Sequence, residues 1–205
     1  GSWCAQFRRL FGDGEYKADS RGRIKEEGEE IAMAEKVSIL ISEQEVADRI
    51  AAMAAQISEA YRDKDLHLIC VLKGGTFFMT ELSKHLSIPC SLDFMALSSY
   101  GDGTKSSGNV KIVKDLDESI EGKDVLVVED IVDSGHTLNY LCRRLNERSP
   151  RSLKLCTLLD KPDRREVFVH VDYIGFQIPD AFVVGYGLDY QQKYRNLPFI
   201  GVVEL

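Results

Sequence analysis

The fold is decided by residues 125–138, which read VLVVEDIVDSGHTL. The first four are apolar and mostly β-branched, which is typical of a strand buried on both faces of a parallel sheet. From Thr137 onward the apolar residues recur at helical spacing, so a helix is predicted to follow. The turn between them therefore lies at a strand end and a helix start, where ligands of open α/β sheets gather.

This turn carries groups that suit an anion. Free backbone N–H groups and the positive end of the helix dipole favour a phosphate at a helix start. Gly135 allows close approach of the backbone, while Ser134 and Thr137 supply hydroxyl donors. From the residues alone an ordinary alternative is equally open, in which Asp133 or Ser134 simply caps the helix.

The composition describes an ordinary globular chain, with 205 residues for one domain of good core size. The net charge of −7 argues against a non-specific nucleic-acid binder, and no apolar run approaches the ~18 residues of a membrane helix. The five cysteines lack C-x-x-C spacing and are expected to be reduced thiols. We therefore expect a cytoplasmic protein without nucleic-acid or membrane partners. Most of the scattered arginine pairs, Arg8-Arg9, Arg143-Arg144 and Arg164-Arg165, are expected on solvated faces.

Two regions are expected along the chain. Residues 1–35 are charge-rich and weakly periodic, and are interpreted as a poorly ordered or peripheral extension. Residues 36–205 alternate strands and helices, which predicts an α/β fold with a doubly wound, mainly parallel sheet. Its core would span about 37–180, with a small hood built from the N- and C-terminal segments.

The predicted strands lie near 37–41, 66–72, 91–97, 110–113, 125–128, 153–159, 171–176, 181–185 and 199–204. One helix should begin after the capping box Ser42-x-x-Glu45, a second after the turn Lys73-Gly74-Gly75, and a third at Thr137. Residues 98–109 are interpreted as a glycine- and hydroxyl-rich loop, and 161–165 as an exposed connection.

The pattern Glu129-Asp130-x-x-Asp133-Ser134-Gly135-x-Thr137 after a hydrophobic strand resembles the phosphoribosyl-pyrophosphate (PRPP) signature of type I phosphoribosyltransferases. The flanking sequence resembles their bacterial 6-oxopurine branch, over roughly residues 36–205. The resemblance implies a purine salvage enzyme that transfers the 5-phosphoribosyl group of PRPP to N9 of hypoxanthine, with guanine as a second base. The products would be IMP or GMP and pyrophosphate.

The same resemblance implies roles for individual residues. Asp133 would be the general base that removes the N7 proton while N9 attacks. PRPP would be bound by Lys73, Gly74, Ser99, Tyr100, Glu129, Asp130, Ser134, Gly135, His136, Thr137 and Arg195. The purine would be bound by Lys161, Phe182, Val183 and Asp189. The implied cofactor is Mg²⁺, with Glu129, Asp130 and Asp189 as its carboxylate contacts.

Some of these positions have ordinary explanations of their own. The turn at Lys73 fits a plain strand-to-helix connection, and an aromatic such as Phe182 on a strand is more often part of a core. Residues 98–109, a lid over the pyrophosphate in the family, could be a solvated linker. Strand alternation sends the adjacent Glu129 and Asp130 to opposite faces, so both reach one ligand only if the chain turns there.

Two other functions stay open. A PRPP-sensing regulator that binds nucleic acid could share the fold, although it would need a basic face that this acidic chain lacks. A phosphoribosyltransferase for xanthine or another base is the second. Members of the family are usually dimers or tetramers, so a homodimer or homotetramer is expected.

Overall fold

The computed structural model describes residues 17–18, 24–26, 29–30, 36–99 and 110–204. Within the predicted extension, the described residues form a small antiparallel sheet of three strands, β1 (Lys17–Ala18), β2 (Ile24–Glu26) and β3 (Glu29–Glu30). The rest of that extension and the part of the predicted lid from Tyr100 onward lie outside the described residues.

The main sheet has six strands in the order β10-β9-β8-β5-β6-β7. Neighbouring strands run parallel except β7, which is antiparallel to β6. This confirms the predicted mainly parallel α/β sheet. The strands are β5 (Leu66–Leu72), β6 (Cys90–Ser99), β7 (Val110–Lys114), β8 (Asp124–Val132), β9 (Ser152–Asp160) and β10 (Tyr173–Gln177).

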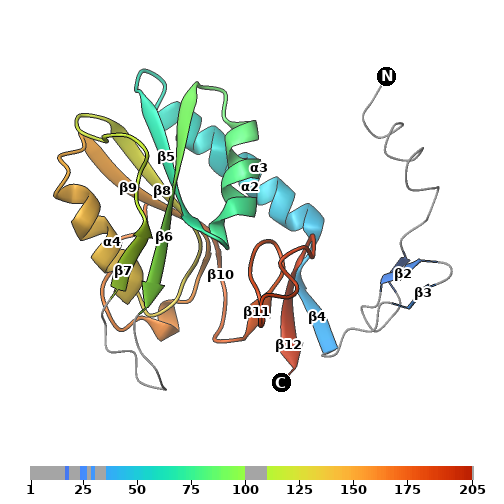
Figure 1. Ribbon diagram of the computed structural model, residues 1–205. Helices are drawn as coiled ribbons and strands as arrows, with labels where there is room; N and C mark the ends of the chain where they lie inside the picture. The colour runs from blue at the N-terminus through green and yellow to red at the C-terminus, as the bar shows by residue number, and fades with distance from the viewer. Residues whose placement is uncertain (1–16, 19–23, 27–28, 31–35, 100–109, 205) are drawn as a thin grey trace.

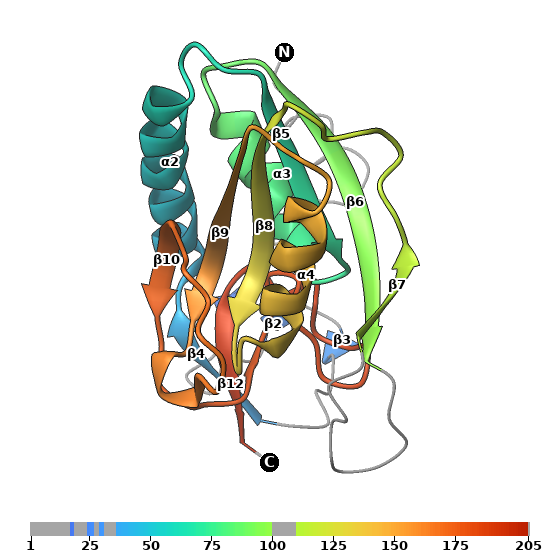
Figure 2. The ribbon, with the colours of Figure 1, turned by 90° about the vertical axis from the view of Figure 1, so that its left-hand side faces the viewer.

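Helices cover both faces of this sheet (Figures 1 and 2). Helices α2 (Glu43–Ala60) and α3 (Gly75–His85) lie on one face, and α4 (His136–Asn146) lies on the other. Alternate residues of β8 supply both cores, since Val128 packs in the α2–α3 cluster and Val127 in the α4 cluster. A strand buried on both faces needs the unbroken apolar run that the sequence shows.

The predicted capping box is present at the start of α2. The Ser42 side chain accepts a hydrogen bond from the Glu45 backbone N–H, and the Glu45 side chain accepts one from the Ser42 backbone N–H. The apolar face that follows, including Val46, Ile50 and Met53, is fully buried. The capping box therefore fixes where α2 begins, directly after β4.

A second, smaller sheet lies beside the carboxyl ends of the parallel strands (Figure 2). It is antiparallel, in the order β11-β12-β4, and joins β4 (Lys36–Ile41) to β11 (Val183–Val184) and β12 (Ile200–Glu204). The Lys36 ammonium lies 2.9 Å from the Glu204 carboxylate. The first and last strands of the described domain are thus neighbours.

The central strand is longer than predicted. The prediction ended it at Val128, but β8 continues to Val132. Its pairing with β5 ends at Val128, whereas its pairing with β9 continues through Ile131 and Val132. The acidic pair Glu129-Asp130 therefore lies in the strand and not in the turn, because the neighbour on one side extends the ladder.

Two further observations concern the cysteines and the helices. Cys70, Cys90, Cys142 and Cys156 are free thiols. Across the residues that the structure describes, no helix combines the length and the apolar character needed to cross a bilayer.

Candidate active site

The turn at the end of β8, residues 133–137, begins α4 without a side-chain cap. Gly135 is the N-cap residue, with φ of 90°, and no side-chain cap hydrogen bond is formed within the part of the chain that the structure describes. The ordinary alternative, in which Asp133 or Ser134 caps the helix, is therefore wrong. Among the described residues, the first backbone N–H groups of α4 therefore donate to no capping side chain, and such free groups favour an anion.

A second segment holds this turn in place. The backbone N–H groups of Glu166 and Val167 both donate to the Ser134 carbonyl at 3.0 Å. A Cβ atom on Gly135 would come within 2.4 Å of the Val167 carbonyl oxygen. Arg165 donates to the Asp133 carbonyl at 2.6 Å and also pairs with Asp160. The segment 164–167 thus fixes the backbone of residues 133–135.

The side chain of Asp133 points away from the core, with 46% of it exposed. One carboxylate oxygen, Oδ1, accepts a hydrogen bond from Arg164 Nε at 3.2 Å. Further along the turn, His136 Nε2 lies 2.9 Å from a Glu166 carboxylate oxygen, and Thr137 is exposed. The turn therefore presents a carboxylate, an imidazole and a hydroxyl to solvent from one end of α4.

Two carboxyls follow each other near the end of β8: Asp130 is buried, and Glu129 has one buried oxygen, Oε2. Burial raises the pKa of Glu129 well above its ordinary value, and the neighbouring Asp130 charge raises it further. Burial also raises the pKa of Asp130, against the opposing effect of hydrogen bonds from Ile131 N–H and from Glu129. Glu129 Oε2 has no hydrogen-bond partner among the described residues. Both residues lie within β8, so the chain does not turn between them as the sequence argument required.

The turn after β5 packs on Asp130. A Cβ atom on Gly74 would lie 1.6 Å from Asp130 Oδ2, so glycine alone leaves room for this carboxylate. The Leu72–Lys73 peptide bond is cis. A Cβ atom on Gly187 would lie 2.1 Å from the Gly74 carbonyl oxygen, so the hood segment closes over the same turn.

Arg195 completes this side of the site. Its Nη1 donates to the Gly187 carbonyl at 2.7 Å, and its Nη2 lies 2.6 Å from Asp189 Oδ1. The positive charge of Arg195 opposes the rise in the pKa of Asp130 that burial causes. Gly74 follows β5, Asp130 lies in β8, and Arg195 lies in the segment between β11 and β12, so three separate parts of the chain meet here.

The carboxylates Glu129, Asp130 and Asp189 supply only some of the ligands that a hard cation needs. Among the described residues, no three His, Cys, Asp or Glu side chains converge on one point. Asp189 is paired with Arg195 and accepts a hydrogen bond from the Gln192 N–H at 2.8 Å. Glu129 and Asp130 remain as a buried pair with one unpartnered oxygen. Such a pair fits a divalent ion that takes its other ligands from phosphate oxygens and water.

The other end of the site is built around Lys161, which is 8% exposed. The prediction of an exposed connection is wrong for this residue, because its Nζ donates to the Ala181 carbonyl at 2.6 Å. Its backbone N–H donates to Val132, which ties it to the end of β8. Asp180 Oδ1 lies 3.8 Å from the ammonium.

Phe182 is 44% exposed, so the interpretation that it belongs to the core is wrong. Its ring meets Tyr190 edge-on, with centroids 5.5 Å apart. The next residue, Val183, is buried and pairs with Val202 in the hood sheet. The aromatic face is thus held by a strand on one side and by Tyr190 on the other.

Sequence reasoning did not predict that residues 164–166 contact the turn 133–137 or that Asp180 lies near Lys161. The prediction that Arg165 lies on a solvated face is wrong, since 18% of its side chain is exposed and it pairs with Asp160. The only signal in the sequence was the doubled arginine before Glu166. Of the predicted lid, Ser99 is the last residue of β6, and Tyr100 lies outside the described residues.

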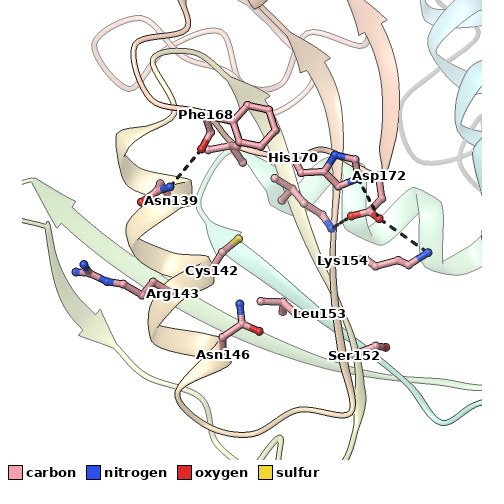
Figure 3. A pocket seen from close by; sticks show the side chains of 12 residues that line it. Asn139, Cys142, Arg143, Asn146, Ser152, Leu153, Lys154, Phe168, His170 and Asp172 are labelled. Atoms are coloured by element: carbon pink, nitrogen blue, oxygen red, sulfur yellow. Dashed lines mark hydrogen bonds and ion pairs between the residues drawn. The ribbon is translucent and has the colours of Figure 1, made fainter.

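A cavity of about 590 Å³ lies elsewhere, between α4, the start of β9 and residues 168–172 (Figure 3). Asn139 donates to the Phe168 carbonyl at its upper rim, and Lys154 and His170 both face Asp172. None of the residues that the sequence predicted for the site lines this cavity. It is separate from the groups described above.

Known proteins share this architecture. Residues 37–191 match the family model of the phosphoribosyl transferase domain. The hypoxanthine phosphoribosyltransferase of Salmonella typhimurium is 51% identical over 175 residues, covering 84% of this chain and 98% of that protein. The hypoxanthine-guanine phosphoribosyltransferase of Bacillus subtilis is 51% identical over 166 residues, covering 81% and 92%.

Solved structures agree with this match. A crystal structure of a hypoxanthine phosphoribosyltransferase from Staphylococcus aureus has a TM-score of 0.79 at 46% identity, covering 82% of this chain and 91% of that chain. The similarity of the fold thus coincides with close sequence similarity. The chain belongs to the phosphoribosyltransferase family, among its hypoxanthine and hypoxanthine-guanine members.

Proposed function

We propose that this chain is a purine salvage enzyme that transfers the 5-phosphoribosyl group of PRPP to N9 of hypoxanthine or guanine. The observation that carries the proposal is the arrangement on β8. A buried carboxyl pair is followed, three residues after Asp130, by the half-exposed Asp133 and then by a helix start without a side-chain cap. The named relatives carry out this class of reaction.

The 5-phosphate would be bound at residues 134–137. The backbone N–H groups at the start of α4 and the hydroxyls of Ser134 and Thr137 are donors, and no acidic residue lies in the first turn of the helix. His136 adds a donor when its pairing with Glu166 is given up. The hydrogen bonds from Glu166 and Val167 to Ser134 would keep the turn in shape before the phosphate arrives.

The pyrophosphate would lie between Lys73, the Gly74 backbone and Arg195. Glu129 and Asp130 would hold the ribose hydroxyls, directly or through a divalent cation. We propose Mg²⁺ as that cation, with Asp189 as a further contact, and when bound it would neutralise negative charge on the leaving pyrophosphate. Ser99 and Tyr100 would begin a lid that excludes water from the reacting carbon.

In the reaction, the bond from C1 of ribose to the pyrophosphate oxygen breaks and the electron pair leaves with pyrophosphate. N9 of the purine forms the new bond to C1, and Asp133 accepts the proton from N7. Lys161 would donate to the exocyclic O6, because an ammonium can donate but not accept. Phe182 would stack on the base, with the Val183 backbone at its edge.

Asp133→Asn tests the base directly. The variant should fold normally, because the side chain is half exposed and caps no helix. Its kcat should fall by about 10²–10⁴-fold, the usual contribution of a general base. Asp163→Asn, an exposed neighbour on η1 (Pro162–Arg164), is the matched control and should keep the wild-type kcat. A wild-type kcat for Asp133→Asn would refute the assignment.

A panel of bases separates the possible reactions. With PRPP and Mg²⁺, hypoxanthine and guanine should give nucleotide, followed by the change in ultraviolet absorbance, while adenine should not. Turnover of xanthine alone would favour the alternative function of a phosphoribosyltransferase for xanthine. Binding of nucleic acid without turnover of any base would favour the PRPP-sensing regulator.

Assembly and location follow the family. We infer a homodimer or homotetramer, which analytical ultracentrifugation at micromolar concentration checks, and a monomer there would contradict it. The free thiols of Cys70, Cys90, Cys142 and Cys156 support a reducing compartment, which we take to be the cytoplasm. The net charge of −7 supports small-molecule substrates over nucleic acid or an anionic membrane as partners.

A further inference from the structure

Arg164 lies next to the proposed base, and the reaction as described gives it no role. It ends η1, and 50% of its side chain is exposed. Its Nε donates to Asp133 Oδ1 at 3.2 Å, and its Nη1 lies 3.6 Å from Asp180 Oδ2. Asp133 belongs to the phosphate-binding turn, whereas Asp180 lies two residues before Phe182. The guanidinium therefore connects the phosphate and purine ends of the site.

The contact with Asp133 involves one carboxylate oxygen. Among residues 36–99 and 110–204, Arg164 is the side chain that hydrogen bonds to this carboxylate, and it does so through Oδ1. A half-exposed carboxylate that lacks such a partner rotates freely about its last bond. With Oδ1 held by Arg164, Oδ2 is left to accept a proton. A general base is effective only when its accepting oxygen is within hydrogen-bond reach of the proton.

The neighbouring arginine serves a different purpose. Arg165 donates to the Asp133 backbone carbonyl and pairs with the buried Asp160, so it holds the main chain and not the carboxylate. The other end of the Arg164 guanidinium lies 3.6 Å from the Asp180 carboxylate, an ion-pair distance. Arg164 therefore lies between the carboxylates of Asp133 and Asp180.

We propose that Arg164 is a positioning residue for the transfer reaction, which fixes the carboxylate plane of Asp133 so that Oδ2 faces N7 of the purine. This inference rests on the proposed function, in which Asp133 is the base. Arg164 touches neither the purine nor PRPP in this assignment and acts through Asp133 alone.

The test is the rate of the chemical step in a single turnover, measured by rapid quench with PRPP, Mg²⁺ and hypoxanthine. Arg164→Gln should lower this rate by about two- to fivefold, the effect expected when an exposed ion pair is lost. The KM for PRPP should stay unchanged. Arg144→Gln is the matched control, because that side chain on α4 is 45% exposed and pairs with Glu147, the C-cap residue of the helix. It should keep the wild-type rate.

The Asp133→Asn background distinguishes positioning from a general structural effect. If Arg164 acts through Asp133, Arg164→Gln should cause no further loss in that background. An equal loss in both backgrounds, or a wild-type rate for Arg164→Gln alone, overturns the proposal. If Asp133→Asn is slow while Arg164→Gln is not, the positioning role alone fails. If Asp133→Asn keeps the full rate, the base assignment fails and the positioning role fails with it.

Discussion

Gly135→Ala should destabilise the protein and weaken PRPP binding together. Gly135 has φ of 90°, where an alanine costs about 1–2 kcal/mol. The added Cβ would also meet the Val167 carbonyl oxygen at 2.4 Å, so the turn and the segment 164–167 must separate. Separation breaks the two hydrogen bonds that Ser134 accepts, each worth about 0.5–1.5 kcal/mol net. The expected total is about 2–5 kcal/mol.

Gly122→Ala is the matched control. Gly122 also has a positive φ, of 70°, but a Cβ there would meet nothing within 4 Å. Its cost should be the backbone strain alone, about 1–2 kcal/mol. The difference between the two variants therefore isolates the contact with Val167.

Thermal unfolding measures that difference, since each kcal/mol shifts the Tm of a chain of this size by about 2–4 °C. Gly135→Ala should melt clearly below Gly122→Ala, and its KM for PRPP should rise more than its KM for hypoxanthine. Equal Tm values for the two variants would refute the claim that the segment 164–167 holds the turn by close contact.

Three further predictions follow from single side chains. Lys161→Ala should raise the KM for hypoxanthine well above any change in the KM for PRPP, and equal changes would refute contact with O6. Phe182→Ala should also raise the KM for hypoxanthine. Because Phe182 is 44% exposed, its loss of stability should be smaller than the ~3–5 kcal/mol typical of truncating a buried phenylalanine to alanine. Urea denaturation measures this loss. Burial lowers the pKa of His67 below its ordinary value of 6.5. As the pH drops, the unfolded chain therefore takes up a proton at a higher pH than the folded chain does. The free energy of unfolding should then fall below about pH 6.5. His67→Gln should lose less stability over that range. Parallel curves of stability against pH for the two proteins would show that His67 is not responsible.

The elements that follow from local pattern could be predicted from the sequence. The unbroken apolar run of β8, the capping box at Ser42 and the helical spacing after Thr137 each depend on neighbours within a few residues. The α/β alternation then leaves few topologies for the sheet. The placement of Asp133 at a strand end and helix start also follows from this local order.

The features that depend on distant contacts could not be predicted. The extension of β8 past Val128 comes from pairing with β9, some 30 residues later in the chain. The burial of Lys161 depends on the Ala181 carbonyl, and the role of Arg165 depends on Asp160 and Asp133. The choice between a core position and a binding position for Phe182 could not be made from local pattern, because its ring neighbour, Tyr190, comes from a later loop.

The adjacency of β4 and β12 has a consequence for the order in which the molecule is assembled. β4 is made first among the strands of the described domain, yet in its sheet it pairs with β12, the last, and its Lys36 meets Glu204 across 168 positions. The segment that bears Asp189 and Arg195 lies between β11 and β12, and so cannot close until the final strand has left the ribosome. An unfinished chain can shape the turn 133–137 but not the segment 185–199, so under the proposed function nascent fragments would have only part of the site.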